Sequence, residues 1–168
     1  EGDEPEDVEG ELVEQDDVEE VVEDEDGEEA EAAEEQDEPT GAYIFMATAN
    51  GTVKKTPLIQ FSRPRTSGLI ALRLEEGDTL IAAAITDGAR EVMMFSDGGK
   101  VIRFKESKVR TMGRTARGVR GMRLPKDQHI ISMLIPAEAA QILTASARGF
   151  GKRTPIDEYP QRGRGGQG

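Results

Sequence analysis

The chain has 168 residues, enough for one domain with a tail, and its formal net charge of −13 combines 34 acidic with 21 basic residues. It contains no cysteine and one histidine, His129, which excludes a disulfide framework, a cysteine zinc site and a thiol nucleophile and disfavours histidine-dependent catalysis. The longest apolar run, residues 80–85, is far shorter than the ~20 residues that span a bilayer, so we expect a cytoplasmic protein with no membrane partner.

Residues 1–40 are an acidic, low-complexity segment with no signal-peptide pattern, and Glu1 in place of an initiator Met indicates a fragment. They hold 23 of the acidic residues and no Lys or Arg, whereas residues 41–168 hold 11 acidic and all 21 basic residues, a net charge of +10. Ordering a chain costs about 1–2 kcal/mol per residue, and this segment has little apolar surface to offset that cost. We predict a disordered insertion or linker, which either aids solubility or competes with DNA for the basic part of the chain.

From Ala42 onward the pattern changes to short apolar or alternating runs separated by turns that contain glycine. Asn50-Gly51 is a strong hairpin signal between two predicted strands. No stretch has a sustained helical period, so the fold class predicted for this part is all-β. The predicted strands are residues 43–49, 52–56, 69–74, 79–86, 91–96 and 100–104.

The basic part of the chain repeats every 50 residues or so. Gly68, Gly118 and Gly168 are spaced by 50, and a glycine turn followed by a basic strand occurs at residues 51–56, 99–104 and 149–154. A repeat of this length with about four strands is typical of a propeller blade. We predict blades at about 42–90 and 91–138 and a partial blade at 139–168, each made of a hairpin, a basic connection and a second hairpin.

The Lys and Arg residues follow the return strand and the connection of each repeat, which a ring of blades would place on one rim. A basic rim suits a duplex that bends along it. With seven Phe and Tyr residues and no Trp, the chain has few groups for base stacking, so contact with phosphates is expected. The alternative is a solvated basic face that keeps the domain soluble. The predicted DNA-binding residues are Lys54, Lys55, Arg63, Arg65, Lys100, Arg103, Lys105, Lys108, Arg110, Arg114, Arg117, Arg120, Lys152, Arg153, Arg162 and Arg164.

No motif of a catalytic or metal site occurs in the sequence. The glycines of residues 149–154 lack the spacing of a phosphate-binding loop, and no nucleophile-elbow motif is present. His129 has apolar neighbours and is interpreted as a residue at the edge of a strand. We therefore predict no catalytic residue, no metal ligand and no cofactor in this chain.

Four stretches resemble the C-terminal domain of bacterial DNA gyrase A: residues 45–56, 99–107, 118–124 and 151–154. The resemblance covers about 42–168 and implies the third, the fourth and part of the fifth blade of a six-bladed β-pinwheel that wraps double-stranded DNA. It further implies a type IIA topoisomerase in which gyrase A assembles with gyrase B as an A2B2 heterotetramer. That whole enzyme would use ATP and Mg to supercoil DNA in the bacterial cytoplasm, close to the nucleoid. The DNA-cleaving tyrosine of the family lies elsewhere, so neither Tyr43 nor Tyr159 inherits its role.

Residues 161–168 resemble the glycine-rich gyrase A box, but Gly163 is an insertion and Gln167 replaces a basic residue. The segment is therefore interpreted as a degenerate copy of the box that contacts DNA. Two alternatives remain open: the matching domain of the gyrase-A-like subunit of topoisomerase IV, and a propeller-like scaffold that binds other proteins. A scaffold would not bind DNA, whereas phosphate contacts would give a steep dependence on salt.

Overall fold

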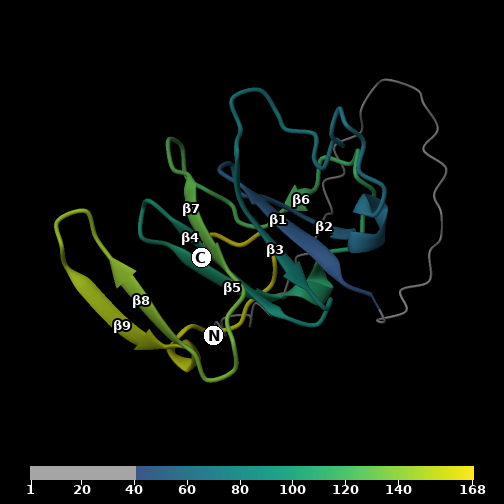
Figure 1. The fold of residues 1–168 in the computed structure, drawn as a ribbon. Coiled ribbons are helices and arrows are strands. Elements are labelled where there is room, and N and C mark those ends of the chain that lie inside the picture. Colours follow the sequence, from purple (N-terminus) through teal and green to yellow (C-terminus); the bar gives the residue numbers. More distant parts are fainter. Residues whose placement is uncertain (1–40) are drawn as a thin grey trace, which may run out of the picture. The chain divides into compact units, whose positions relative to one another are not determined.

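The computed structural model describes residues 41–168, so the predicted disorder of residues 1–40 lies outside the described residues. Within 41–168 the chain forms nine strands and three short 3-10 helices (Figure 1). None of the helices in this range is long and apolar enough to cross a membrane. The strands are β1 (Tyr43–Thr48), β2 (Thr52–Pro57), β3 (Leu80–Thr86), β4 (Glu91–Ser96), β5 (Val101–Lys105), β6 (Val119–Arg120), β7 (Ile130–Leu134), β8 (Gln141–Ala145) and β9 (Gly151–Pro155). The 3-10 helices are η1 (Leu58–Phe61), η2 (Glu106–Lys108) and η3 (Ile156–Glu158).

Each repeat begins with an antiparallel hairpin: β1–β2, β4–β5 and β8–β9. The three turns are built alike, because a hydroxyl at the end of the first strand accepts a hydrogen bond from the amide four residues later. The amides of Thr52, Lys100 and Phe150 donate to Thr48, Ser96 and Ser146 at 3.2, 3.1 and 3.2 Å. The glycine of each turn has a φ between 76° and 87°, which favours glycine over residues with a Cβ. The repeat seen in the sequence is thus a repeat of turn geometry.

In the first sheet, the fourth strand comes from the following repeat. The first sheet has the order β3-β1-β2-β6, in which β6 belongs to the second repeat. The second and third sheets have the orders β5-β4-β7 and β8-β9. The all-β, propeller-like prediction is confirmed, but the predicted second hairpin is wrong: the strand after the connection, β3 or β7, pairs instead with the first strand of its own repeat.

The strand predicted at residues 69–74 is absent from the structure. This segment follows Gly68, which stands 50 residues before Gly118, and the residues after Gly118 form the exchanged strand β6. The equivalent partner of residues 69–74 would be the return strand of an earlier repeat, and no such strand occurs within 41–168. Local apolar character alone therefore does not produce a strand here.

The core lies between successive sheets, and β4 is buried on both faces. Val92 and Met94 pack against the first sheet in one apolar cluster, whereas Met93 and Phe95 pack with Ile142 of the third repeat in another. Burying such a side chain stabilises the fold by roughly 1.5–3 kcal/mol. Because β4 has a neighbouring sheet on each of its two faces, the side chains from Val92 to Ser96 are all buried. In Figure 1 the three hairpins follow one another as neighbouring sheets.

Candidate nucleic-acid interface

The connection of each later repeat lies along the return strand of the repeat before it. In the second repeat, the Met112 amide donates to the Lys55 carbonyl at 2.8 Å and the Arg114 amide donates to Gln60 Oε1 at 3.2 Å. In the third repeat, the Arg162 amide donates to the Arg103 carbonyl at the same 2.8 Å. We call residues 113–118 the first arch and residues 163–168 the second arch. The two arches carry arginines at equivalent places, 50 residues apart.

Each arch ends on a glycine that touches the underlying strand. Gly118 has a φ of 116°, and a Cβ on it would lie 2.7 Å from the Val53 carbonyl oxygen. Gly168 has a φ of 88°, and its Cβ would lie 2.9 Å from the Val101 carbonyl oxygen. A side chain at either position would collide with main-chain atoms, so the 50-residue spacing of Gly118 and Gly168 reflects this close approach, whereas Gly68 has no atom within 4 Å of where its Cβ would lie.

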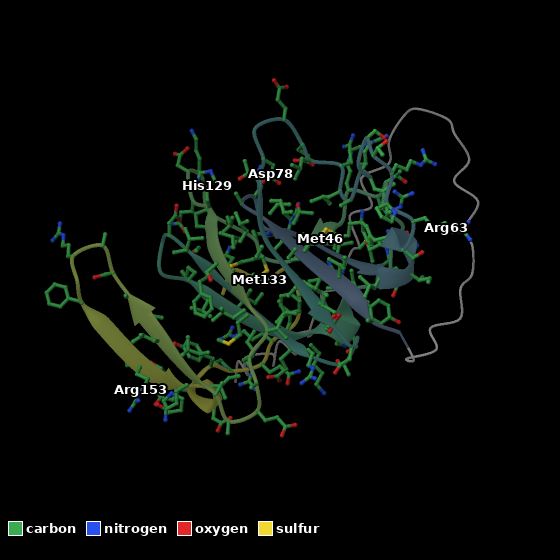
Figure 2. All side chains as sticks on the ribbon, in the orientation of Figure 1. Met46, Arg63, Asp78, His129, Met133 and Arg153 are labelled. Atoms are coloured by element: carbon green, nitrogen blue, oxygen red, sulfur yellow. The ribbon has the colours of Figure 1, made fainter. Side chains whose placement is uncertain are left out.

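Most of the predicted DNA-binding side chains are exposed. Figure 2 shows Arg63 and Arg153 projecting at opposite ends of the series of blades. The exposed members of the predicted set are Arg63, Arg65, Lys100, Lys105, Lys108, Arg110, Arg117, Arg120, Lys152, Arg153 and Arg162. These residues come from all three repeats and from both the return strands and the connections.

Lys54 is inside the protein, which corrects the prediction that it lies on the rim. Its exposed fraction is 0%, and its ammonium group donates to the carbonyl oxygens of Ala71, Arg114 and Ala116 at 3.0, 2.5 and 2.9 Å. Burial and the positive charge of Arg114 lower the pKa of Lys54 from 10.5 to about 8. An ammonium group has three N–H donors, and carbonyl oxygens take all three.

Lys55 and Arg103 are also held within the protein, at equivalent places in the first and second repeats. Lys55 is 3% exposed, with its ammonium nitrogen 5.0 Å from the centre of the Tyr43 ring. Arg103 forms an ion pair with Glu91 at 2.6 Å and donates to two carbonyl oxygens in and after η3 at 2.9 and 3.0 Å. Both side chains join repeats or strands, and we remove them, with Lys54, from the candidate DNA surface.

Arg114 and Arg164 are half-buried members of the two arches. The Arg164 guanidinium donates to the carbonyl oxygens of Lys108 and Arg120 at 3.1 and 2.9 Å. The second arch is also fixed by its main chain, since the Gly165 amide donates to the Gly121 carbonyl at 2.8 Å. The glycine-rich segment at 161–168 is therefore folded onto the second repeat.

Five exposed basic residues were not in the predicted set: Arg73, Arg90, Arg123, Lys126 and Arg148. The sequence did carry a signal for Arg73 and Arg123, because both recur at the 50-residue spacing. Arg90 forms an exposed ion pair with Asp87 at 2.8 Å. The basic surface is thus wider than the return strands and connections alone.

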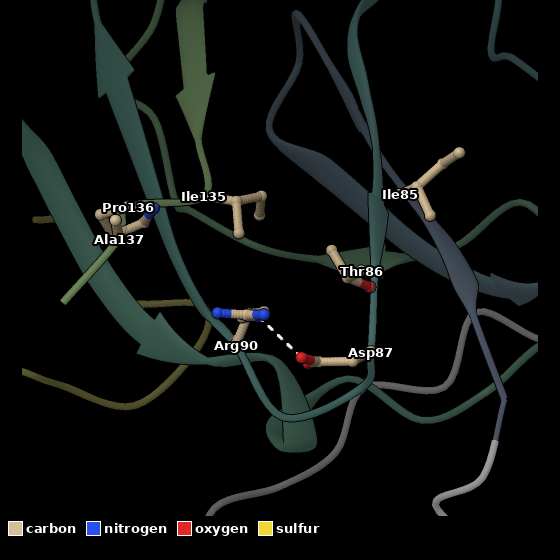
Figure 3. A pocket seen from close by; sticks show the side chains of 7 residues that line it. All are labelled: Ile85, Thr86, Asp87, Arg90, Ile135, Pro136 and Ala137. Carbon is tan, nitrogen blue, oxygen red and sulfur yellow. Dashed lines mark ion pairs between the residues drawn. The ribbon is translucent and has the colours of Figure 1, made fainter.

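A hollow of about 420 Å³ lies where β3 and β7 end, between the segment that follows β3 and the segment that follows β7 (Figure 3). Ile85, Ile135 and Pro136 form its apolar walls, and the ion pair of Asp87 and Arg90 forms its polar part. The Ala89 amide, with a further contribution from Arg90, lowers the pKa of Asp87. Residues 41–168 contain no group of three or more His, Cys, Asp or Glu side chains placed to hold a metal ion.

The sequence profile of the family described as DNA gyrase C-terminal domain, beta-propeller, matches residues 42–87, 90–137 and 140–168. The chain belongs to this family. The three matched stretches correspond to the three repeats, and each begins within a few residues of a hairpin. The recognition of the gyrase A C-terminal domain from the sequence is therefore confirmed.

Curated relatives of the gyrase C-terminal domain family agree with this assignment. The chain is 73% identical over 161 residues to DNA gyrase A of Pseudomonas aeruginosa, an alignment that covers 96% of this chain and 17% of that protein. It is 56% identical over 128 residues to DNA gyrase A of Salmonella typhimurium, covering 76% of this chain and 15% of that protein. The chain thus spans about a sixth of these relatives. The 161-residue alignment is too long to fit within 41–168, so it extends into the acidic segment.

Two solved structures have the same fold. A crystal structure of the C-terminal domain of DNA topoisomerase IV matches with a TM-score of 0.73 and 32% identity, covering 76% of this chain and 40% of that one. A structure of the DNA gyrase A C-terminal domain matches with a TM-score of 0.68 and 27% identity, covering 76% and 42%. Both support a partial β-pinwheel for residues 41–168.

Proposed function

We propose that this chain is a DNA-wrapping segment of DNA gyrase A. It binds double-stranded DNA through phosphate contacts along its exposed rim and bends the duplex over successive blades. It carries no catalytic residue, and it supports ATP-dependent negative supercoiling by an A2B2 assembly with gyrase B in the bacterial cytoplasm. ATP and Mg would bind to other parts of that type IIA topoisomerase.

The observation that carries the proposal is that all three repeats carry exposed Lys and Arg side chains on their return strands or connections. A straight groove needs no such repetition, whereas a duplex that curves around a series of blades meets each blade in the same orientation. The net charge of +10 on residues 41–168 favours a polyanion. An exposed guanidinium group such as that of Arg117, on the first glycine-bounded arch, suits contacts with phosphate oxygens, which do not depend on base sequence.

The test is the affinity of the 168-residue chain for duplex DNA across a salt series. We expect log K to fall with log[salt] by about 0.9 for each phosphate contacted. Replacing Arg117 and Arg120 with Ala should make the slope shallower by up to about 1.8 if each contacts one phosphate. The same double replacement at Lys126 and Arg148, outside the arches, is the control. A slope near zero would contradict the proposal.

The role of the acidic segment is tested in the same assay. Replacing its Asp and Glu residues with Asn and Gln keeps the length and removes the negative charge of residues 1–40. If the segment competes with DNA for the rim, this variant binds duplex DNA more tightly than the unchanged chain, most clearly at low salt. Equal affinities would leave the segment a solvated insertion or linker.

A second candidate is the equivalent domain of the gyrase-A-like subunit of topoisomerase IV, favoured by the TM-score of 0.73 to that solved structure. The two candidates differ in how strongly the domain wraps DNA. Ligating a nicked DNA circle in the presence of the chain and counting the supercoils that remain separates them, since a wrapping domain traps supercoils. A protein-binding scaffold would trap none and would not bind DNA.

A further inference from the structure

Lys54 joins two connections that are far apart in the sequence. Ala71 lies in the connection of the first repeat, whereas Arg114 and Ala116 lie in the first arch, which belongs to the second repeat. The Lys54 ammonium group donates to all three carbonyl oxygens at 2.5–3.0 Å. Because the ammonium group has only three N–H donors, it has none left for a phosphate group.

Apart from Lys54, the first arch is held mainly at its two ends, and a hydrogen bond from the Ala116 amide to the Gly113 carbonyl at 3.3 Å closes a turn within it. It begins at Gly113, which leaves the backbone freer there than another residue would, and it ends at Gly118, which lies against Val53. The Arg114 amide is held by Gln60, and β6 pairs with β2 only at Thr52 and Val53. Between these contacts, two hydrogen bonds from Lys54 fix the carbonyl groups of Arg114 and Ala116.

The second arch provides an internal comparison. At the position equivalent to Lys54, the second repeat has Ile102, whose Cδ1 atom would lie 3.7 Å from a Cβ on Gly166. There the arch rests on an apolar side chain, and Arg164 ties it down through carbonyl groups of the second repeat. The first arch is held by a buried lysine of the strand under it, whereas the second is held by its own arginine and by main-chain hydrogen bonds.

We propose that Lys54 is a positioning residue that holds the first arch so that Arg114 and Arg117 present their guanidinium groups to the DNA backbone. The inference rests on the proposed function and assigns Lys54 a role without contact to DNA. The buried ammonium group orients the arch main chain, and the arginines supply the phosphate contacts. Replacing Lys54 therefore weakens DNA binding because the arginines of the first arch are no longer held in position.

The test is a double-mutant cycle for duplex affinity in the 168-residue chain, using Lys54→Ile and the pair Arg114→Ala with Arg117→Ala. Isoleucine is chosen because Ile102 shows that the fold accepts it at this place in a blade. We expect Lys54→Ile alone to weaken binding at low salt and to make the salt slope shallower by more than the ~0.9 of a single phosphate contact. In the background that lacks Arg114 and Arg117, Lys54→Ile should change the affinity by less than about two-fold.

A second readout needs no DNA. Trypsin cleaves after Arg and Lys, so we expect cleavage after Arg114 and Arg117 to be faster in Lys54→Ile than in the unchanged chain. Lys126→Met, which removes one positive charge outside the arches, should leave this rate unchanged. Circular dichroism confirms that each variant is folded, and Lys54→Met replaces the isoleucine variant if that one is not.

The outcomes separate the two proposals. If the unchanged chain fails to bind duplex DNA, the proposed function is overturned, and this role for Lys54 falls with it. If the chain binds DNA but Lys54→Ile acts equally in both backgrounds, or leaves affinity and cleavage unchanged, only the role of Lys54 is overturned.

Discussion

We call the contact between two successive repeats a seam. The first seam joins the first and second repeats, the second seam joins the second and third, and the two differ in chemistry. Between the first and second repeats, the Glu106 side chain is fully buried, accepting hydrogen bonds from the Thr86 hydroxyl and, at 3.3 Å, from the Arg90 amide. Between the second and third repeats, the positions equivalent to Thr86 and Glu106 hold Pro136 and Ile156. At this pair of positions the first seam is polar and the second is apolar, so a repeat's neighbours constrain its sequence.

The largest expected effect is at the second seam. Arg103→Met removes the ion pair with Glu91 and two hydrogen bonds to carbonyl groups of the third repeat, and should lower the free energy of unfolding by about 3 kcal/mol. Hydrogen exchange of the β8–β9 amides should accelerate most, since these bonds hold that hairpin. Arg153→Met, at the equivalent but exposed place, is the control and should change stability by less than about 0.5 kcal/mol. Equal effects of the two variants would show that the seam does not depend on Arg103.

At the first seam, Thr86→Val should cost about 1–3 kcal/mol, because Glu106 keeps its buried carboxyl group but loses a donor. The double variant Thr86→Val with Glu106→Leu imitates the apolar second seam and should be more stable than Thr86→Val alone. Thermal melting of the two single variants and the double variant measures the coupling. Additive losses would mean that the polar pair is not a unit.

The buried lysine beside the first seam gives a dependence on pH. Its pKa is about 8 in the folded protein and 10.5 ordinarily, so between these values the unfolded chain binds a proton that the folded chain has released. The free energy of unfolding should therefore rise with pH across this window, relative to Lys54→Met. Denaturant titrations of both proteins between pH 7 and 10.5 measure the difference. A constant difference across the series would contradict the lowered pKa.

The smallest effect is expected in the linker of the second seam. Ala139 has a φ of 53°, in the left-handed region that disfavours residues with a Cβ. Ala139→Gly should stabilise the protein by about 0.5–1 kcal/mol, since relief of strain exceeds the added freedom of the unfolded chain. Asp127, with a φ of 62°, stands where the first repeat has Gly77, and Asp127→Gly serves as a parallel case. Destabilisation of both variants would contradict this account.

Local signals in the sequence were sufficient to predict the hairpins and the repeat, because a turn glycine and alternating strands act over a few residues. They were insufficient for β6, whose partner Thr52 lies in another repeat and leaves no local pattern. Burial of the predicted rim residues was missed for a related reason. Lys54 and Lys152 occupy equivalent places in similar sequences, yet Lys54 is buried and Lys152 is exposed. The sequence of a strand does not show which other segment will cover it.

The exchange of β6 between neighbouring repeats has a consequence for anyone who edits this chain. A cut between the first and second repeats does not yield a self-sufficient module, since the first sheet keeps an open edge while β6 is left without a sheet. Removing or duplicating a stretch one repeat long is a different operation: every strand then finds the equivalent edge of a new neighbour, wherever the splice is made. Such arrays can grow or shrink by whole periods, provided that the seam residues of the new neighbours match.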